Sequence, residues 1–234
     1  MERIFDYIDA HTDEYLSRLQ RACAQPSISA TGEGLADMAT LVQEMLDGIG
    51  FDVNLVSPNA GATGEAPTVV LGWMEGTGDR TVMLYNHYDV QPVDPLDEWT
   101  SPPFVPEVRD GKLYGQGACD MKGGLAAVMM AFDALADRDL AGDVLLTAVV
   151  DEEGPYGLGT DRLIRDGVVD DCDAAIVTEP GPILAQEDVE NPALLLGARG
   201  RYFYDIEVRG QAAHGSKPET GVNAVVEAGK LAAA

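Results

Sequence analysis

Four short polar clusters contain the residues that could do chemistry, and each follows a strand-like segment or turn of the chain. They are His87-Tyr88-Asp89, Cys119-Asp120-Met121, Asp151-Glu152-Glu153 and the single residue Glu179. One imidazole and several carboxylates at a single point cannot all stay ionised without a cation. A ligand set of one nitrogen and several oxygens, without a thiolate, suits zinc, with cobalt or manganese as alternatives. If the fold brings the clusters together, they predict a metal site.

Each cluster taken singly also has an ordinary structural explanation. A His-x-Asp sequence is often a surface turn, three successive acids often form a solvated loop, and Glu179 could cap a helix. What favours a site is that all of these groups follow strand-like segments within one stretch of the chain.

Hydrophobic runs predict the elements that position the clusters. Strands are predicted at residues 51–56, 68–74, 81–85, 143–150 and 174–177, and the last three are expected to be buried. Helices are predicted at residues 2–24, 35–49, 125–135 and 158–166. This alternation predicts an α/β fold with a mostly parallel sheet and helices on both faces. Ligands of such sheets bind beyond the carboxyl ends of the strands, where the clusters stand.

The hydrophobic pattern of the sequence changes after Pro192. Residues 202–209 alternate like an exposed antiparallel strand, and residues 222–234 form an alanine-rich helical pattern. We therefore expect one domain over residues 1–192 and the beginning of a second, α+β domain over residues 193–234.

The charge balance is strongly acidic. Asp and Glu total 40 against 15 Lys and Arg, for a formal net charge of −25. Such a surface repels phosphate backbones and anionic lipids, so neither nucleic acid nor a membrane is an expected partner. Because the acids are spread along the chain, we interpret them as a halophilic surface; an ordinary acidic protein is the alternative.

The cysteines and the N-terminus indicate the compartment. Three cysteines without a CxxC pair predict no disulfide framework, which favours a reducing environment. The first residues are charged and amphipathic, without the apolar core of a signal peptide. The expected location is the cytoplasm.

Five motifs in order resemble the co-catalytic zinc aminoacylase and carboxypeptidase family. They are YNHYDVQP, GQGACDMKGG, DEEGPYGLGT, VTEP and GQAAHGSKPETGVNA. Members of this family include acetylornithine deacetylase, succinyl-diaminopimelate desuccinylase, glutamate carboxypeptidase and carnosinase-like dipeptidases. The resemblance implies a zinc-peptidase-like catalytic domain over residues 1–192, a lid or dimerisation domain that begins at residue 193, and a homodimer.

The resemblance also implies a role for each polar group around the metals. His87 and Glu179 would bind one of two zinc ions, Asp120 would bridge both, and Glu153 would bind the second. Asp89 would hold the other ring nitrogen of His87. The same resemblance implies a cis peptide bond after Asp120.

Two further residues would act on the substrate. Glu152 would be the general base that deprotonates a zinc-activated water. By the resemblance, His214 would reach the site from the second domain and stabilise the oxyanion. The alternative for His214 is a turn histidine packed in a hinge.

The implied reaction is hydrolysis of an amide bond in a small molecule. Glu179 and the DMKGG stretch favour an N-acyl amino acid, as in the deacetylases and desuccinylases. The stretches HYDVQPVDPLDEWTSPPF and DGKLYGQGA favour a short peptide, as in the dipeptidases and carboxypeptidases. An alternative from another class is a catalytically inactive metal-binding or assembly fragment.

The chain departs from the family pattern in one respect. Family members carry a final histidine ligand far downstream, and the remaining histidine here, His11, lies in the first predicted helix. We therefore expect a fragment of a longer chain or the product of a truncated gene, inactive on its own.

Overall fold

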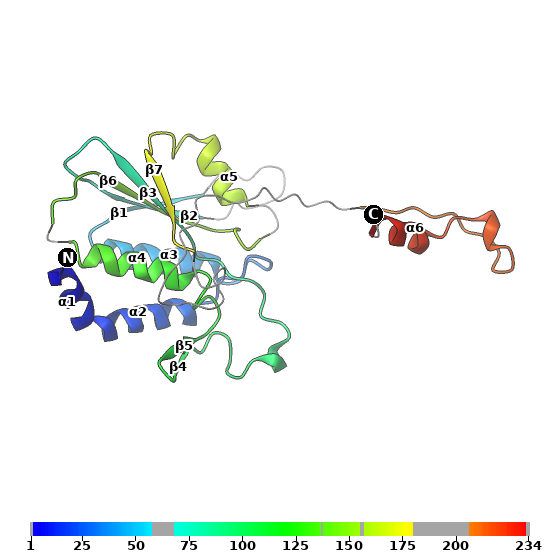
Figure 1. Ribbon diagram of the computed structural model, residues 1–234, viewed down its shortest axis with the longest axis horizontal. Coiled ribbons are helices and arrows are strands. Elements are labelled where there is room, and N and C mark those ends of the chain that lie inside the picture. The colour runs from blue at the N-terminus through cyan, green and yellow to red at the C-terminus, as the bar shows by residue number, and fades with distance from the viewer. Residues whose placement is uncertain (1, 58–67, 137, 155–156, 180–205, 233–234) are drawn as a thin grey trace. The chain divides into compact units, whose positions relative to one another are not determined.

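The computed structural model describes residues 2–57, 68–136, 138–154, 157–179 and 206–232 (Figure 1). The chain divides into two compact units, residues 1–193 and 194–234, and each is described by itself. Among the described residues, no helix combines the length and the apolar character needed to cross a bilayer.

A five-stranded sheet forms the centre of the first unit. Its order is β1 (Asp52–Val56), β2 (Val69–Met74), β6 (Asp143–Val149), β3 (Thr81–His87) and β7 (Ala174–Val177). The pairs β6–β3 and β3–β7 are parallel, while β2 is antiparallel to both β1 and β6. Four of these five strands therefore run in one direction, which confirms the predicted mostly parallel sheet.

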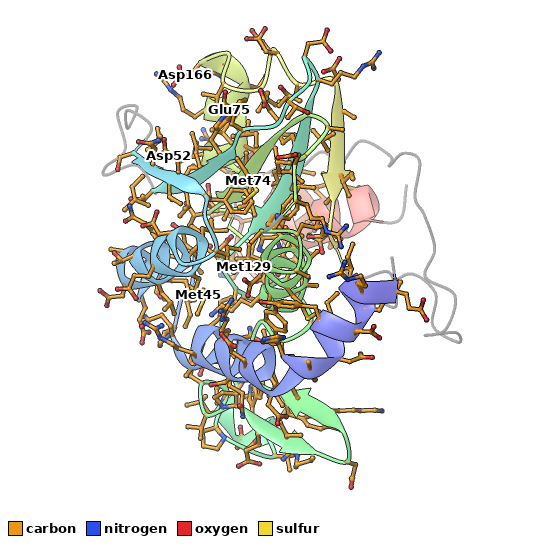
Figure 2. The ribbon with its side chains drawn as sticks, turned by 90° about the vertical axis from the view of Figure 1, so that its left-hand side faces the viewer. Met45, Asp52, Met74, Glu75, Met129 and Asp166 are labelled. Carbon is orange, nitrogen blue, oxygen red and sulfur yellow. The ribbon has the colours of Figure 1, made fainter. Side chains whose placement is uncertain are left out.

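Helices cover both faces of the sheet, as predicted. On one face α3 (Leu35–Asp47) and α4 (Lys122–Asp133) pack on alternate residues of β2 and β6, such as Leu146, which is fully buried. On the other face Leu163 of α5 (Leu158–Arg165) packs on the intervening residues of the same strands. The side chains of β2 and β6 divide between the two faces because successive residues of a strand point to opposite sides of the sheet. Figure 2 shows α3 and α4 side by side beneath the sheet.

The predicted first helix is two helices, so that expectation was wrong. α1 (Glu2–Ala10) and α2 (Thr12–Ala24) are separated at His11. The Thr12 hydroxyl donates to the carbonyls of Ile8 and Asp9, at 3.1 and 3.2 Å. Such local side-chain bonds compete with helical backbone bonds, and here they accompany the break. The second of these helices forms a third layer beneath α3 and α4 (Figure 2).

The predicted burial of residues 174–177 was also wrong. All four residues of β7 are exposed, including Ile176 and Val177 at 52 and 54%. Within the described residues β7 is one of the two edge strands of the sheet and pairs only with β3. Its apolar composition therefore reflects strand propensity rather than burial in this part of the chain.

A short hairpin was missed from the sequence. β4 (Glu107–Arg109) and β5 (Lys112–Tyr114) pair antiparallel across Asp110 and Gly111. Both turn residues have positive φ, 51° and 76°, which a two-residue hairpin turn favours and an Asp-Gly pair supplies. The Asp-Gly dipeptide was the available signal. A single 3₁₀ turn, η1 (Leu96–Glu98), interrupts the proline-rich loop before it.

The second unit contains η3 (Pro218–Thr220) and α6 (Ala224–Ala232). The Asn223 side chain accepts from the N–H groups of Val225 and Val226 at the start of α6, as an N-cap residue does. Of the strand predicted at residues 202–209, residues 202–205 lie outside the described residues. Residues 206–209 are not a strand.

We expect Leu146→Ala to destabilise the protein by about 2–5 kcal/mol, because it leaves a cavity between the sheet and α3 and α4. The matched control is Leu55→Ala in β1, whose side chain is 41% exposed and should cost far less. Urea unfolding of both variants measures the difference. Equal losses would contradict the assignment of the core to this face of the sheet.

Candidate metal centre

Three neighbouring parallel strands end on the same side of the sheet, and polar clusters follow them there. β3 ends at His87, β6 is followed by Glu152 and Glu153, and β7 is followed by Glu179. The carboxyl ends of parallel neighbours lie side by side, so the clusters that follow them converge. Asp120 joins them from the loop between β5 and α4, and its peptide bond to the next residue is cis, as the resemblance implied.

The imidazole of His87 faces three carboxylates through Nε2. The distances from Nε2 are 3.0 Å to Asp120 Oδ1, 3.4 Å to Glu179 Oε1 and 3.9 Å to Glu152 Oε2. Glu153 completes a set with His87 and Asp120 in which one ligand atom from each residue lies within 4.8 Å of the others. The structure therefore brings together the four residues predicted as ligands and the predicted base.

The site is buried on one side and open on the other. The His87 side chain is fully buried, whereas those of Asp120, Glu152 and Glu179 are 41, 41 and 37% exposed. A small molecule can thus reach the carboxylates while the imidazole is held in the protein.

The second ring nitrogen of His87 contacts Asp89. Nδ1 lies 3.1 Å from the Asp89 main-chain oxygen and 3.4 Å from Oδ1. Among the described residues, an N–H on Nδ1 can donate only to these acceptors, which leaves Nε2 to meet the cluster. In a metal site this is the arrangement that directs the free lone pair of Nε2 at the cation.

Without a cation, a proton on His87 offsets the surrounding negative charge. Burial lowers the pKa of His87, but interactions with the carboxylates of Asp120, Asp89 and Glu179 outweigh burial and raise the pKa to about 12. The donor set therefore favours a positive charge at Nε2, the position that a divalent cation would share.

Glu152 and Glu153 differ in their contacts although they are adjacent. Glu153 accepts a hydrogen bond from the Gln91 side chain at 2.6 Å, and its N–H donates to Asp89. Burial raises the pKa of both carboxyl groups, so their contacts rather than their pKa values distinguish the two residues. A carboxylate with a raised pKa is better suited to exchanging protons near neutral pH.

Three residues around the site were missed from the sequence. The Ser29 hydroxyl donates to Asp89, and Gln91 donates to Glu153. Lys122 is buried, and its ammonium donates to the carbonyls of Ala22 and Gln25 at 2.9 and 2.7 Å. Ser29 offered no signal because its partner is 60 residues away, while Lys122 stood next to a predicted cluster.

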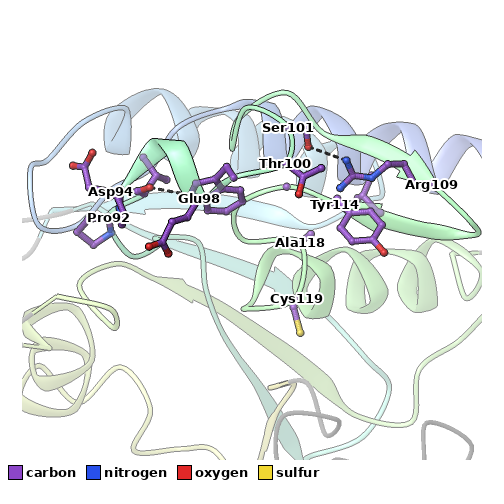
Figure 3. Close-up of a pocket in the computed structure, with 14 residues that line it drawn as sticks. Pro92, Asp94, Glu98, Thr100, Ser101, Arg109, Tyr114, Ala118 and Cys119 are labelled. Atoms are coloured by element: carbon purple, nitrogen blue, oxygen red, sulfur yellow. Dashed lines mark hydrogen bonds between the residues drawn. The ribbon is translucent and has the colours of Figure 1, made fainter.

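An open cleft of about 730 Å³ adjoins the site at Cys119 (Figure 3). The Arg109 guanidinium lies 4.1 Å from the centre of the Tyr114 ring in its wall. Asp94 and Glu98 add carboxylates to the lining. The cleft therefore offers both signs of charge and an aromatic surface beside the carboxylate cluster around His87.

The remaining predicted site residue, His214, belongs to the second unit. Its Nδ1 lies 2.8 Å from the Ser216 hydroxyl, and its side chain is exposed. Its reach into the site stays a prediction.

Solved structures with this fold define the class. Human carnosine dipeptidase 1 superposes with a TM-score of 0.68 at 29% identity, covering 75% of this chain and 40% of that one. An M20 family metallo-carboxypeptidase from Sulfolobus solfataricus has a TM-score of 0.65 at 32% identity, covering 72% and 38%. The fold is that of the α/β peptidases that these structures represent.

Sequence comparison then gives the family. The model of peptidase family M20/M25/M40 matches residues 83–230, and the chain belongs to this family. A succinyl-diaminopimelate desuccinylase of Dechloromonas aromatica (strain RCB) is 33% identical over 224 residues, which are 93% of this chain and 55% of the relative. The chain thus spans about half the length of the curated relatives that it matches, and the resemblance found in the five motifs is confirmed.

The cleft leads to a prediction for the cysteines. Cys119 is exposed in the cleft, whereas Cys23 is buried and burial raises the pKa of its thiol to about 11. We expect N-ethylmaleimide at pH 7.5 to label Cys119 in the folded protein and to label Cys23 only after unfolding. Peptide mapping by mass spectrometry measures both. Labelling of Cys23 under native conditions would contradict the packing of α2.

Proposed function

We propose that the complete protein is a metal-dependent hydrolase that cleaves an amide bond in a small molecule. The observation that carries the proposal is the convergence of His87 Nε2 with three carboxylates at the ends of three parallel strands. Membership of a peptidase family supports the reaction class.

We infer that the donor set forms part of a site for two divalent cations. His87 and Glu179 would hold one, Glu153 the other, and Asp120 would contact both. One nitrogen and several carboxylate oxygens suit zinc, with cobalt or manganese as alternatives. When bound, such a pair would polarise the amide carbonyl and lower the pKa of water.

Glu152 is the proposed general base. Its carboxylate lies 3.9 Å from Nε2, at the same cluster as the proposed ligands, where it could meet a water bound beside the cations. Its carboxylate would take a proton from water as the water oxygen attacks the carbonyl carbon. The same proton would pass to the departing nitrogen as the C–N bond breaks, which yields a carboxylic acid and an amine.

The remaining chain contributes orientation and charge. Asp89 would keep His87 in the tautomer that leaves Nε2 free, and the buried sheet edge would restrict water on one side. His214, if the second unit brings it to the site, would donate to the oxygen that becomes negative during attack.

The proposed substrate is an N-acyl amino acid, with a short peptide as the second candidate. The desuccinylase relative favours the first, and the dipeptidase fold neighbour favours the second. The cleft beside Cys119 would accommodate the part of the substrate remote from the amide, because Arg109 can pair with a carboxylate there. Initial rates of the full-length protein with N-succinyl-diaminopimelate, N-acetylornithine and simple dipeptides test the order. If dipeptides are the best substrates, a short peptide replaces the N-acyl amino acid as the first candidate.

We also infer the setting in which the complete protein works. The acidic charge of −25 supports a halophilic protein and disfavours nucleic acid or a membrane as a partner. A cytoplasmic location and a homodimer follow from the family resemblance and the cysteine pattern.

We expect Glu152→Gln in the full-length protein to retain metal but to lose about 100- to 10,000-fold in kcat, because an amide cannot take the proton from water. The matched control is Glu75→Gln. Glu75 also follows a strand, but β2 runs opposite to its neighbours, so this carboxylate lies at the other edge of the sheet (Figure 2). Steady-state kinetics and metal analysis are the measurements. Near-normal kcat in Glu152→Gln would exclude Glu152 as the base.

A further inference from the structure

A short segment near the N-terminus, residues 27–29, runs alongside residues 88–90 at the end of β3. The Val90 N–H donates to the Ser27 carbonyl at 2.9 Å, and the Ser29 N–H donates to the Val90 carbonyl at 3.3 Å. The buried Ser27 hydroxyl donates to the Tyr88 carbonyl at 2.7 Å. The backbone that carries the metal-site residue Asp89 is therefore held on both sides of that residue.

Within this segment only Ser29 reaches the Asp89 carboxylate. Its hydroxyl donates to Oδ2, and the Glu153 N–H donates to the same oxygen at 3.0 Å. The other oxygen, Oδ1, is buried and lies 3.4 Å from His87 Nδ1, without the geometry of a hydrogen bond. Two donors on one oxygen fix the rotation of the carboxylate and so fix where the other oxygen points.

Asp89 in turn joins the two halves of the site. Its main-chain oxygen and Oδ1 face His87, and its Oδ2 holds the backbone of Glu153. Loss of the Ser29 hydroxyl would leave a single donor on a fully buried carboxylate. The carboxylate could then rotate. It would no longer hold the imidazole of His87 and the backbone of Glu153 in fixed positions relative to each other.

We propose that Ser29 is a positioning residue for the metal centre, acting through Asp89 on His87 and Glu153 together. The inference rests on the proposed metal role of those two residues. Outer groups that orient metal ligands typically contribute about 10- to 100-fold in affinity. Ser29 is one hydrogen bond farther from the metal ligands than Asp89 is. Through Asp89, however, it affects two proposed ligands, His87 and Glu153, rather than one.

Ser27 offers a matched control in the same segment. It is more buried than Ser29, and its hydroxyl also makes a hydrogen bond, but its acceptor is the main-chain oxygen of Tyr88. A purely structural role for the segment predicts that both hydroxyls matter alike. A positioning role predicts that only Ser29 changes metal binding.

The experiment compares Zn²⁺ affinity in the wild-type protein, Ser29→Ala, Ser29→Thr and Ser27→Ala, by competition with a chromophoric chelator. We expect Ser29→Ala to bind Zn²⁺ about 10- to 100-fold more weakly. Ser29→Thr, which keeps the hydroxyl, should recover most of the affinity. Ser27→Ala should lower the melting temperature while its Zn²⁺ affinity stays within about 3-fold of the wild type, because Asp89 keeps both donors.

Two results would overturn the inference alone while leaving the metal site in place. One is wild-type affinity in Ser29→Ala, and the other is an equal loss of affinity in Ser27→Ala. A wild-type protein that binds no Zn²⁺ would overturn the proposed function, and this inference with it. None of these comparisons measures turnover. A protein that lacks the proposed activity can therefore still support or contradict the role of Ser29.

Discussion

The constraint on which the structure depends is the accumulation of carboxylates around one buried imidazole. Asp89, Asp120, Glu152 and Glu179 all lie within 4 Å of a ring nitrogen of His87, and the net charge of the chain adds to their repulsion. Such a cluster holds together only if a positive charge sits among the carboxylates or if the scaffold is rigid enough to resist them. The raised pKa of His87 shows how strongly the cluster favours a cation.

The scaffold resists this repulsion by tight packing around the strand ends. A side chain at Gly124 of α4 would lie 2.3 Å from the Thr178 carbonyl, so only glycine lets this helix approach the residue before Glu179 so closely. Thr178 also donates to the buried Asn86 side chain, next to His87. Lys122, at the start of the same helix, ties it to the end of α2. These contacts fix the clusters before any ligand arrives.

Much of this arrangement could be predicted from the sequence, because the signals are local. Apolar runs located the five strands of the sheet, and a polar residue soon after a strand marked the members of the site other than Asp120, which lies in a loop. What failed depended on distant partners: the exposure of β7 is decided by what covers it, and Ser29 finds Asp89 only in the fold. The break at His11 involved local hydrogen bonds that compete with a strong helical pattern, which hydrophobic periodicity does not register.

The strand order has a consequence for synthesis on the ribosome. β3 is the strand that carries His87 and begins at Thr81, whereas its two partners, β6 and β7, begin only at Asp143 and Ala174. Its apolar residues Val82, Met83 and Leu84 must therefore leave the exit tunnel without neighbours to pair with. At a translation rate of about 5–20 residues per second, β7 follows β3 after on the order of 5–20 s. During this time the apolar strand β3 is unpaired and can aggregate. We therefore expect nascent chains of this protein to bind chaperones that recognise extended apolar stretches, and the acidic surrounding sequence to help keep the chains apart.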